Sequence, residues 1–241
     1  MNERQLVLKN GEKIDVIQLT GGHLDEILAL QQKVIESLTT GAFLQPLMPE
    51  EFLTILHGKG MMIGAYYKDR LIAFRAMFEP EADEEEHLGI DAGVPVAELS
   101  TVIYSEISNV DPHFRGNNLQ VLLGEILMQE IDTEKFHYVC TTVAPFNIAS
   151  LKDKFAHGMK IVALKVKYGD LLRYILVKNL LQTLQEKAID SCEIPMADTA
   201  QQQRYLEDGW QGTAIKQVDN QWVVRYEKIM LFSEYNPTPR T

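Results

Sequence analysis

The stretch NVDPHFRGNNLQVLLGEIL, residues 109–127, contains the residue types of an anion-binding site. A strand leads through Pro112 into an Arg-Gly-Asn-Asn loop, residues 115–118, and this loop opens a helix. The first backbone N–H groups of a helix have no partner inside it, and together with the helix dipole they attract an anion. Gly116 allows a close approach, and asparagine tolerates a positive φ. The pattern also fits a plain loop whose asparagines cap the helix, so spacing alone leaves both interpretations open.

The segment VDPHFRGNNLQVLL resembles the pyrophosphate-binding loop of the GNAT superfamily of N-acetyltransferases, with the signature Val-x-Pro-x-x-Arg/Gln-x-x-Gly-x-Gly/Ala. Val110, Pro112 and Arg115 match this signature. Asn118 and Gln120 stand where the family has its two small residues. Asparagine can adopt the left-handed backbone of glycine, so the first departure is mild. The longer side chain of Gln120 either donates a hydrogen bond to the phosphates or crowds them.

A second segment, residues 142–160 (TVAPFNIASLKDKFAHGMK), resembles the family's next strand and helix. Asn147, Ser150 and Gly158 fall on the matching positions. In the family the asparagine and the small residue lie beside the pantetheine arm of the cofactor. A tyrosine seven residues after the asparagine often protonates the leaving thiolate, and Lys154 occupies that position here. The resemblance therefore leaves the general acid unassigned.

The resemblance covers about residues 14–180 and implies a cofactor site. The implied co-substrate is acetyl-CoA, with no metal, and the acceptor is a small amine or a peptide. The residues implied for the cofactor site are Asn109, Val110, Asp111, Arg115, Gly116, Asn117, Asn118, Leu119, Gln120, Asn147, Ser150 and Lys154.

The strand TVIYSEISNV, residues 101–110, supplies the candidates for catalysis. Simple alternation predicts that Tyr104, Glu106, Ser108 and Val110 point to one face and the odd-numbered residues to the other. A backbone N–H near Val110 would polarise the thioester carbonyl. Glu106 would take a proton from the attacking ammonium, directly or through water; its alternative is an ordinary solvated carboxylate. Tyr104 would be an acid, a pocket wall or a structural aromatic.

Hydrophobic periodicity places further elements around these motifs. The earlier ones are a hairpin at Asn10-Gly11, a helix over residues 23–38, a helix from Pro49 to near Gly58, two strands joined at Lys68-Asp69, and the acidic loop 79–86. The later ones are the strand FHYVCTTV, a helix from 148 to Gly158, and the hairpin IVALKVKY and LLRYILVKNL, whose second half also fits a helix. This order predicts an α/β (α+β) fold with a mixed, mostly antiparallel central sheet and helices on both faces, as in the GNAT family.

We expect two units in the chain. Residues 1–180 form a GNAT-like acyltransferase domain, and residues 181–241 form a C-terminal extension. The extension contains a short helix capped at Asp198 and a hairpin around Asp219-Asn220, packed on the core or in a homodimer contact. We expect its tail, residues 236–241, to be disordered.

Composition excludes several classes of function. The 241 residues include 34 acidic and 23 basic ones, which gives a net charge of −11. This charge argues against binding the phosphate backbone of nucleic acid through an excess of Lys and Arg. No apolar run is long enough to span a membrane, and we find no signal peptide. The two cysteines and the six histidines show no ligand spacing, so we expect no metal. A cytoplasmic location follows from these features.

The leading hypothesis is an acetyl-CoA-dependent N-acetyltransferase that moves the acetyl group to a primary amine directly, within a ternary complex. The acidic loop favours a cationic acceptor. Tyr168 and Arg173, near the hairpin turn, either reach the acceptor site or are ordinary exposed turn residues, which are commoner. Cys140 lies mid-strand without a base nearby, which argues against a covalent intermediate. The alternatives are a non-catalytic acyl-CoA sensor or interaction module on a degenerate GNAT fold, and an unrelated α/β scaffold.

Overall fold

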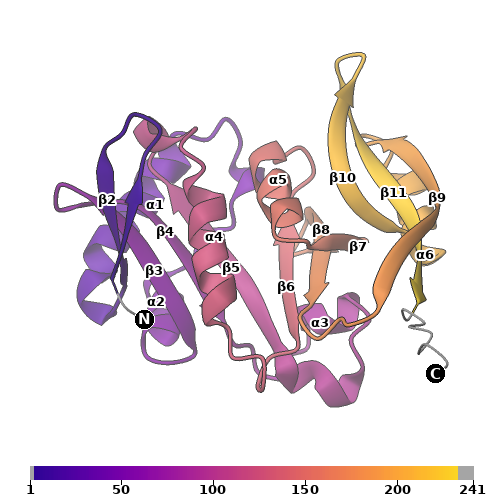
Figure 1. Ribbon diagram of the computed structural model, residues 1–241, viewed down its shortest axis with the longest axis horizontal. Coiled ribbons are helices and arrows are strands. Elements are labelled where there is room, and N and C mark those ends of the chain that lie inside the picture. The colour runs from indigo at the N-terminus through magenta and orange to yellow at the C-terminus, as the bar shows by residue number, and fades with distance from the viewer. Residues whose placement is uncertain (1–2, 233–241) are drawn as a thin grey trace, which may run out of the picture.

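The computed structural model describes residues 3–232 and shows how the predicted elements combine into one sheet (Figure 1). Within those residues the sheet has eleven strands, in the order β1-β2-β3-β4-β5-β6-β8-β7-β10-β11-β9. The strands are β1 (Arg4–Val7), β2 (Lys13–Gln18), β3 (Gly60–Tyr67), β4 (Arg70–Phe78), β5 (Val102–Val110), β6 (Tyr138–Val143), β7 (Lys160–Lys167), β8 (Leu171–Asn179), β9 (Gln185–Pro195), β10 (Gln211–Val218) and β11 (Gln221–Phe232). Among these described strands, β5 and β6 run parallel and the other neighbours are antiparallel.

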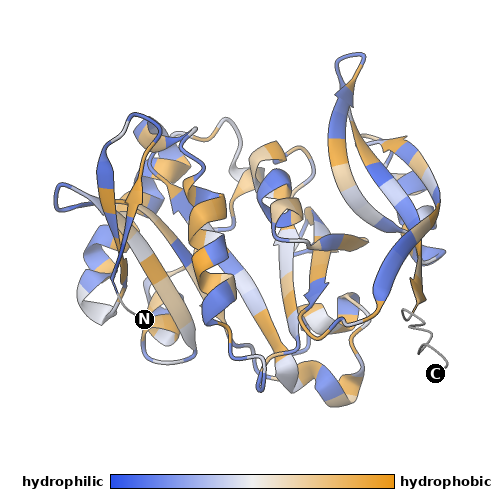
Figure 2. Ribbon diagram, in the orientation of Figure 1, coloured by the Kyte–Doolittle hydropathy of each residue, from blue (hydrophilic) through white to orange (hydrophobic). Residues whose placement is uncertain are grey.

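Helices cover both faces of this sheet, as predicted. The helices α1 (Leu24–Glu36) and α2 (Pro49–Leu56) bury apolar side chains against one face of β3–β5. The helices α4 (Leu119–Glu130) and α5 (Ile148–Ala156) lie on the opposite face, and α4 is apolar over much of its length (Figure 2). The short helix α3 (Leu88–Asp91) lies beside β6, and α6 (Thr199–Glu207) packs on β7 and β10. None of the helices in the described region is long and apolar enough to cross a bilayer.

The predicted hairpins form because their turn residues accept a positive φ. Lys68 and Asp69 have φ of 48° and 61°, and Asp219 and Asn220 have φ of 46° and 63°. Two consecutive residues with positive φ are typical of the type I′ turn, whose twist matches that of the flanking strands. The segment 171–179 is strand β8, so the prediction left open between strand and helix is resolved as a strand.

The parallel strands β5 and β6 separate after a short stretch of pairing. Val102–Tyr104 pair with Tyr138–Cys140. One further link follows, in which the Thr141 hydroxyl donates to the carbonyl oxygen of Ser105 at 2.8 Å. Beyond this point the strands diverge, and a wedge opens between them toward the carboxyl end of β5.

A β-bulge at Glu106 changes which residues face this wedge. Against β4, Ser105 pairs with Met77 and Ile107 with Ala76, so Glu106 is the extra residue. An extra residue reverses the alternation of the side chains that follow it. Ser105 therefore lies on the α4–α5 face, whereas Ile107 packs in the core beneath α1 and α2. The prediction that the odd-numbered residues of this strand share a face is wrong across Glu106.

The C-terminal extension continues the sheet. The predicted helix is α6, where the Asp198 carboxylate accepts a hydrogen bond from the Gln201 N–H at 3.0 Å, and the predicted hairpin is β10–β11. The sequence analysis missed β9, a mostly exposed edge strand with few apolar residues to signal it. The extension meets the rest of the chain where Gly212 of β10 pairs with Ile161 of β7. Residues 233–241, including the tail predicted to be disordered, lie outside the described part of the chain.

Candidate functional site

A cavity of about 960 Å³ lies between the carboxyl end of β5 and the N-termini of α4 and α5. Its walls come from the last turns of α1, the loop after β5, the first turn of α4, and the start of α5. The predicted residues that line it are Asn109, Val110, Arg115, Gly116, Asn118, Leu119, Gln120, Asn147 and Ser150. The fold therefore gathers the two sequence motifs around one space that is large enough for a cofactor.

The start of α4 has the backbone geometry that the loop composition predicted. Asn118 precedes the helix with φ of 63° in the left-handed region, and Gly116 has φ of 82°. Asparagine is among the few non-glycine residues that adopt this conformation at low cost. The free N–H groups of the first turn of α4 are therefore presented at the cavity, where they can bind an anion.

Asp111 and Asn117 shape this loop but do not line the cavity. The buried Asp111 carboxylate accepts hydrogen bonds from Lys33 Nζ at 2.8 Å and from the His113 N–H at 3.0 Å. The Asn117 side chain accepts from the Lys9 N–H at 3.2 Å and donates to the Phe114 carbonyl at 3.0 Å. Asp111 and Asn117, which were predicted to bind the cofactor, therefore stabilise the loop that borders the cavity.

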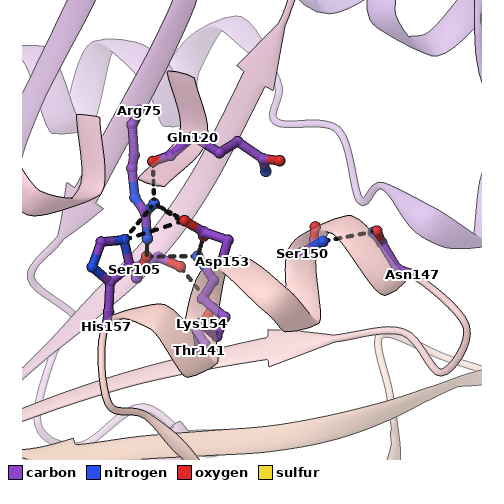
Figure 3. Close-up of polar contacts among 9 residues, drawn as sticks. All are labelled: Arg75, Ser105, Gln120, Thr141, Asn147, Ser150, Asp153, Lys154 and His157. Carbon is purple, nitrogen blue, oxygen red and sulfur yellow. Dashed lines mark hydrogen bonds and ion pairs between the residues drawn. The ribbon is translucent and has the colours of Figure 1, made fainter. Parts of the chain in front are cut away.

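The helix α5 begins at a capping asparagine. Asn147 Oδ1 accepts a hydrogen bond from the Ser150 N–H at 3.3 Å (Figure 3), and its Nδ2 donates to the Phe43 carbonyl at 3.0 Å. Asn147 thus fixes both the start of α5 and the segment that crosses the cavity mouth. Phe146, just before it, has φ of 65°, which is rare for a bulky residue and occurs here at the cavity wall.

Unpaired, buried polar atoms lie in the wall of the larger cavity. Asn109 is 1% exposed, and in the described part of the chain neither its Oδ1 nor its Nδ2 has a hydrogen-bond partner. The buried Oγ of Ser108 is also without one among those residues. A buried polar group without a partner is costly, so such groups mark a place where a ligand can supply the missing hydrogen bonds.

A second cavity, of about 190 Å³, fills the wedge between β5 and β6. Its polar lining includes Glu51, Glu106, Lys154, Tyr168 and Arg173. Ser108, Gln120, Asn147 and Ser150 line both cavities, so the two spaces are adjacent. The wedge therefore joins the face of the sheet covered by α4 and α5 to the face on which Glu106 lies.

Glu106 has the properties of a base at neutral pH. Burial raises the pKa of its carboxyl group to about 7, and the negative charges of Glu51 and Glu84 add to the effect. Within residues 3–232, no hydrogen bond or ion pair occupies its carboxylate. A carboxylate with a pKa near the working pH can take up and release a proton readily.

Lys154 is a buried cation that also lines the wedge. Its Nζ donates to Ser105 Oγ at 3.1 Å and lies 3.1 Å from Asp153 Oδ2 (Figure 3). Burial lowers the pKa of Lys154 to about 8, and the positive charge of Arg75 contributes, although Asp153 opposes the shift. An ammonium group with this pKa can donate a proton near neutral pH.

A buried charged network holds Lys154 in place. Arg75 Nη1 donates to Asp153 at 2.8 Å and to the Gln120 carbonyl at 2.8 Å, and its Nη2 donates to Ser105 at 3.1 Å (Figure 3). His157 Nε2 lies 3.2 Å from the Asp153 carboxylate. Burial acts to raise the pKa of Asp153, but the neighbouring Lys154, His157 and Arg75 hold it well below its usual range. The network links β4, β5, α4 and α5.

Arg75 and Asp153 are not among the residues predicted from sequence. The available signal was a lone arginine inside the apolar strand RLIAFRAMF, since a fully buried charge needs a partner. The partner lies 78 residues away in the chain, and no sequence pattern connects the two.

Gly124 leaves room for this network inside α4. A Cβ atom at this position would overlap His157 Nε2 and Arg75 Nη1, and neither buried side chain has space to move. We expect Gly124→Ala to lower the free energy of unfolding by about 1–3 kcal/mol, measured by urea denaturation. Gly41→Ala is the control, because its Cβ would meet no atom within 4 Å. Equal stability of the two variants would contradict the packing described here.

The structure places Tyr104 away from both cavities. Its hydroxyl accepts a hydrogen bond from the Leu88 N–H at 2.8 Å, and its ring packs against His87 and Phe78. Among residues 3–232, no group of three or more His, Cys, Asp or Glu side chains is arranged to hold a metal ion. The titratable side chains that line the wedge are those of Glu51, Glu106, Lys154, Tyr168 and Arg173.

Comparison with known proteins identifies the fold. No family model matches the chain, and no curated protein matches it. Among solved structures, the GNAT domain of PAT from S. lividans aligns with a TM-score of 0.54 at 16% identity, covering 74% of this chain and 97% of that one. A putative acetyltransferase from Salmonella typhimurium, solved with its cofactor acetyl-CoA, aligns with a TM-score of 0.55 at 12% identity, covering 75% and 100%. A polyamine N-acetyltransferase from Drosophila melanogaster gives 0.52 at 16% identity, covering 69% and 100%. The chain has the GNAT fold.

Proposed function

We propose that this protein transfers an acetyl group from acetyl-CoA to a primary amine, directly within a ternary complex. The observation that carries the proposal is the wedge between β5 and β6, which joins a cofactor-sized cavity to a site with a base on one side and an acid on the other. The GNAT fold supports it, since a neighbour of that fold was solved with acetyl-CoA.

The residues of the larger cavity fit the parts of acetyl-CoA. The N–H groups at the start of α4, after Asn118, would hold the pyrophosphate. The unpaired Ser108 and Asn109 would bond the amide groups of the pantetheine arm. Acetyl-CoA supplies an acetyl group already activated as a thioester.

Two residues would move the protons of the reaction. The Glu106 carboxylate would accept a proton from the acceptor ammonium, which frees the amine to attack the thioester carbonyl. As the C–S bond breaks, the Nζ of Lys154 would give a proton to the sulfur, and the second proton that the nitrogen loses on forming the amide would pass to water. A thiol has a pKa of about 8.5 in water, so a donor with a pKa of about 8 is well matched to the leaving thiolate.

Direct transfer is favoured over a covalent acyl-enzyme. Cys140 is fully buried in β6, and burial raises the pKa of its thiol to about 12. A thiol in this state forms little of the thiolate that a nucleophile needs. We assign Tyr104 a structural role, because its hydroxyl bonds the backbone of α3.

Calorimetric titration with acetyl-CoA tests the cofactor site. We expect saturable binding, and an affinity at least about tenfold lower for Asn118→Ile, because a β-branched residue resists the positive φ of this position. Asn118→Gly is the matched control and should bind as the wild type does, because glycine adopts positive φ freely. Absence of binding at millimolar acetyl-CoA would overturn the proposal.

Release of free thiol over a panel of amines tests the reaction itself. Turnover with at least one amine is the expected result. Binding of acetyl-CoA without turnover on any amine would favour the alternative, a non-catalytic acyl-CoA sensor on the same fold. This alternative is supported by Asn118 and Gln120, which stand where the family has its two small residues.

A further inference from the structure

Arg173 is a buried arginine without a carboxylate partner. It is 4% exposed, and among the described residues its one hydrogen bond runs from Nη1 to the Leu172 carbonyl at 3.2 Å. A guanidinium carries five N–H donors. A buried charge is normally paired, since an unpaired one loses its hydration without compensation. Arg173 therefore has N–H donors without a protein partner at the wedge that it lines.

Two acids, Asp91 and Glu86, pair with lysines of the same hairpin as Arg173. Its cross-strand neighbour Lys165 bonds Asp91 at 2.7 Å. Lys167 lies 3.1 Å from the same carboxylate and 3.1 Å from Glu86. Neither acid pairs with Arg173, and among the described residues Glu51 and Glu106, which line the same cavity, form no ion pair with it either.

Glu106 also lines the wedge cavity but does not neutralise Arg173. A guanidinium in contact with a carboxylate lowers the pKa of that carboxyl group. The pKa of Glu106 is instead raised to about 7, by burial and by two other acids. Tyr168, which lines the same cavity, interacts electrostatically with both Glu106 and Arg173. The acceptor side of the wedge therefore presents a base and a separate cation.

Arg173 faces this side because of its place in β8. Its neighbour Tyr174 points the other way, where its hydroxyl bonds Gln202 at 2.6 Å. Successive side chains of a strand point to opposite faces, so Arg173 points toward the face that carries Glu106 and Tyr168. It does not line the larger cavity, so it is separate from the residues assigned to the phosphates of the cofactor.

We propose that Arg173 binds a carboxylate of the acceptor, so that the acceptor is an amino acid: its ammonium lies at Glu106 and its carboxylate at the Arg173 guanidinium in the wedge. This inference rests on the proposed acetyl transfer and names its substrate class. A guanidinium and a carboxylate match in shape and form paired, charge-assisted hydrogen bonds. Arg173 is thus a residue that determines specificity.

Matched acceptor pairs test this inference by thiol release with the full chain. Each pair is an amino acid and the amine left after its decarboxylation, such as lysine with 1,5-diaminopentane and ornithine with 1,4-diaminobutane. We expect kcat/KM for at least one amino acid to exceed that of its amine by about 10- to 100-fold, the value of a charged hydrogen-bonded pair. Equal or better use of the amines in every pair would overturn the inference.

Variants locate the effect at Arg173. Arg173→Met should raise KM for the preferred amino acid about 10- to 100-fold, with little change for its amine or for acetyl-CoA. Arg173→Lys should keep part of the preference, because it retains the charge without the paired geometry. Arg225→Met, at an exposed arginine of β11, is the control. An equal loss for amino acid and amine in Arg173→Met would overturn the inference.

A binding measurement separates this inference from the proposed reaction. If no acceptor turns over, calorimetry with the same amino acids in the presence of CoA tests Arg173 alone. Binding that is lost in Arg173→Met and kept in Arg225→Met would support the carboxylate site even where acetyl transfer fails. Absence of amino-acid binding to the wild type would overturn it. If Arg173→Met does not fold, the wild-type preference within each acceptor pair decides.

Discussion

Replacing Glu106 by glutamine lowers kcat about 10²- to 10⁴-fold if the carboxylate is the base, the range typical of general-base catalysis. Glutamine keeps the size and hydrogen-bonding capacity of the side chain but cannot accept the ammonium proton. The half-buried carboxylate lines the wedge and is not held by other described residues, so its loss should leave the fold intact. Thiol release at saturating acetyl-CoA and acceptor measures the effect.

The pH profile adds a second measurement of the same role. The pKa of Glu106 is raised to about 7, so the carboxylate form, which the reaction needs, disappears as the pH falls below 7. We expect kcat to fall about tenfold per pH unit on that side, and Glu106→Gln should lose this dependence. Glu85→Gln, in the exposed acidic loop, is the matched control. A rate unchanged in Glu106→Gln would remove Glu106 from the mechanism.

The elements that sequence could predict are those determined by local patterns. The turns at Lys68-Asp69 and Asp219-Asn220 need residues that accept positive φ, and the sequence has them. The loop before α4 was identified from residue types that suit a helix start, and Asn118 adopts the left-handed backbone expected of it. Such features depend on a few neighbouring residues, which is why they could be predicted.

The orientation of side chains in the site could not be predicted in the same way. The bulge at Glu106 depends on how β5 pairs with β4, and one extra residue reverses every later position. It separates Ser105, beside Lys154, from Ile107, under α1. Alternation alone also placed Tyr104 near the chemistry, whereas its hydroxyl bonds the backbone of α3, an element of four residues that the sequence analysis did not predict.

Charge pairs between different strands and helices are a further feature that local sequence patterns could not predict. Sequence showed Lys154 at the position where the family has tyrosine, but its low pKa comes from burial beside Arg75, a residue of β4. The meeting of Arg75 with Asp153 requires the complete sheet and both helices. Arg173 could not be assigned from sequence for the same reason. Only the structure shows that it has no carboxylate partner, while Lys165 and Lys167 both pair with Asp91.

Lys154→Met is expected to lower kcat about 10²- to 10⁴-fold if Lys154 donates the proton to the departing sulfur. Methionine fills similar volume without a proton to give. The fold should survive, because the Asp153 carboxylate keeps its contacts with Arg75 at 2.8 Å and with His157 at 3.2 Å. The substitution also removes a buried positive charge that repels Arg75. Lys135→Met, at an exposed lysine paired with Glu79, is the matched control.

The pH dependence distinguishes proton donation from a structural role of Lys154. Its pKa is lowered to about 8, so the ammonium form that the reaction needs is lost as the pH rises above 8, and the wild-type rate should fall on that side. Lys154→Met should lose this alkaline fall. Lys154→Tyr should recover part of the rate and move the fall to higher pH, because a phenol holds its proton to a pKa of about 10. A purely structural lysine would change the rate of both variants without moving the profile, and that outcome would exclude Lys154 as the acid.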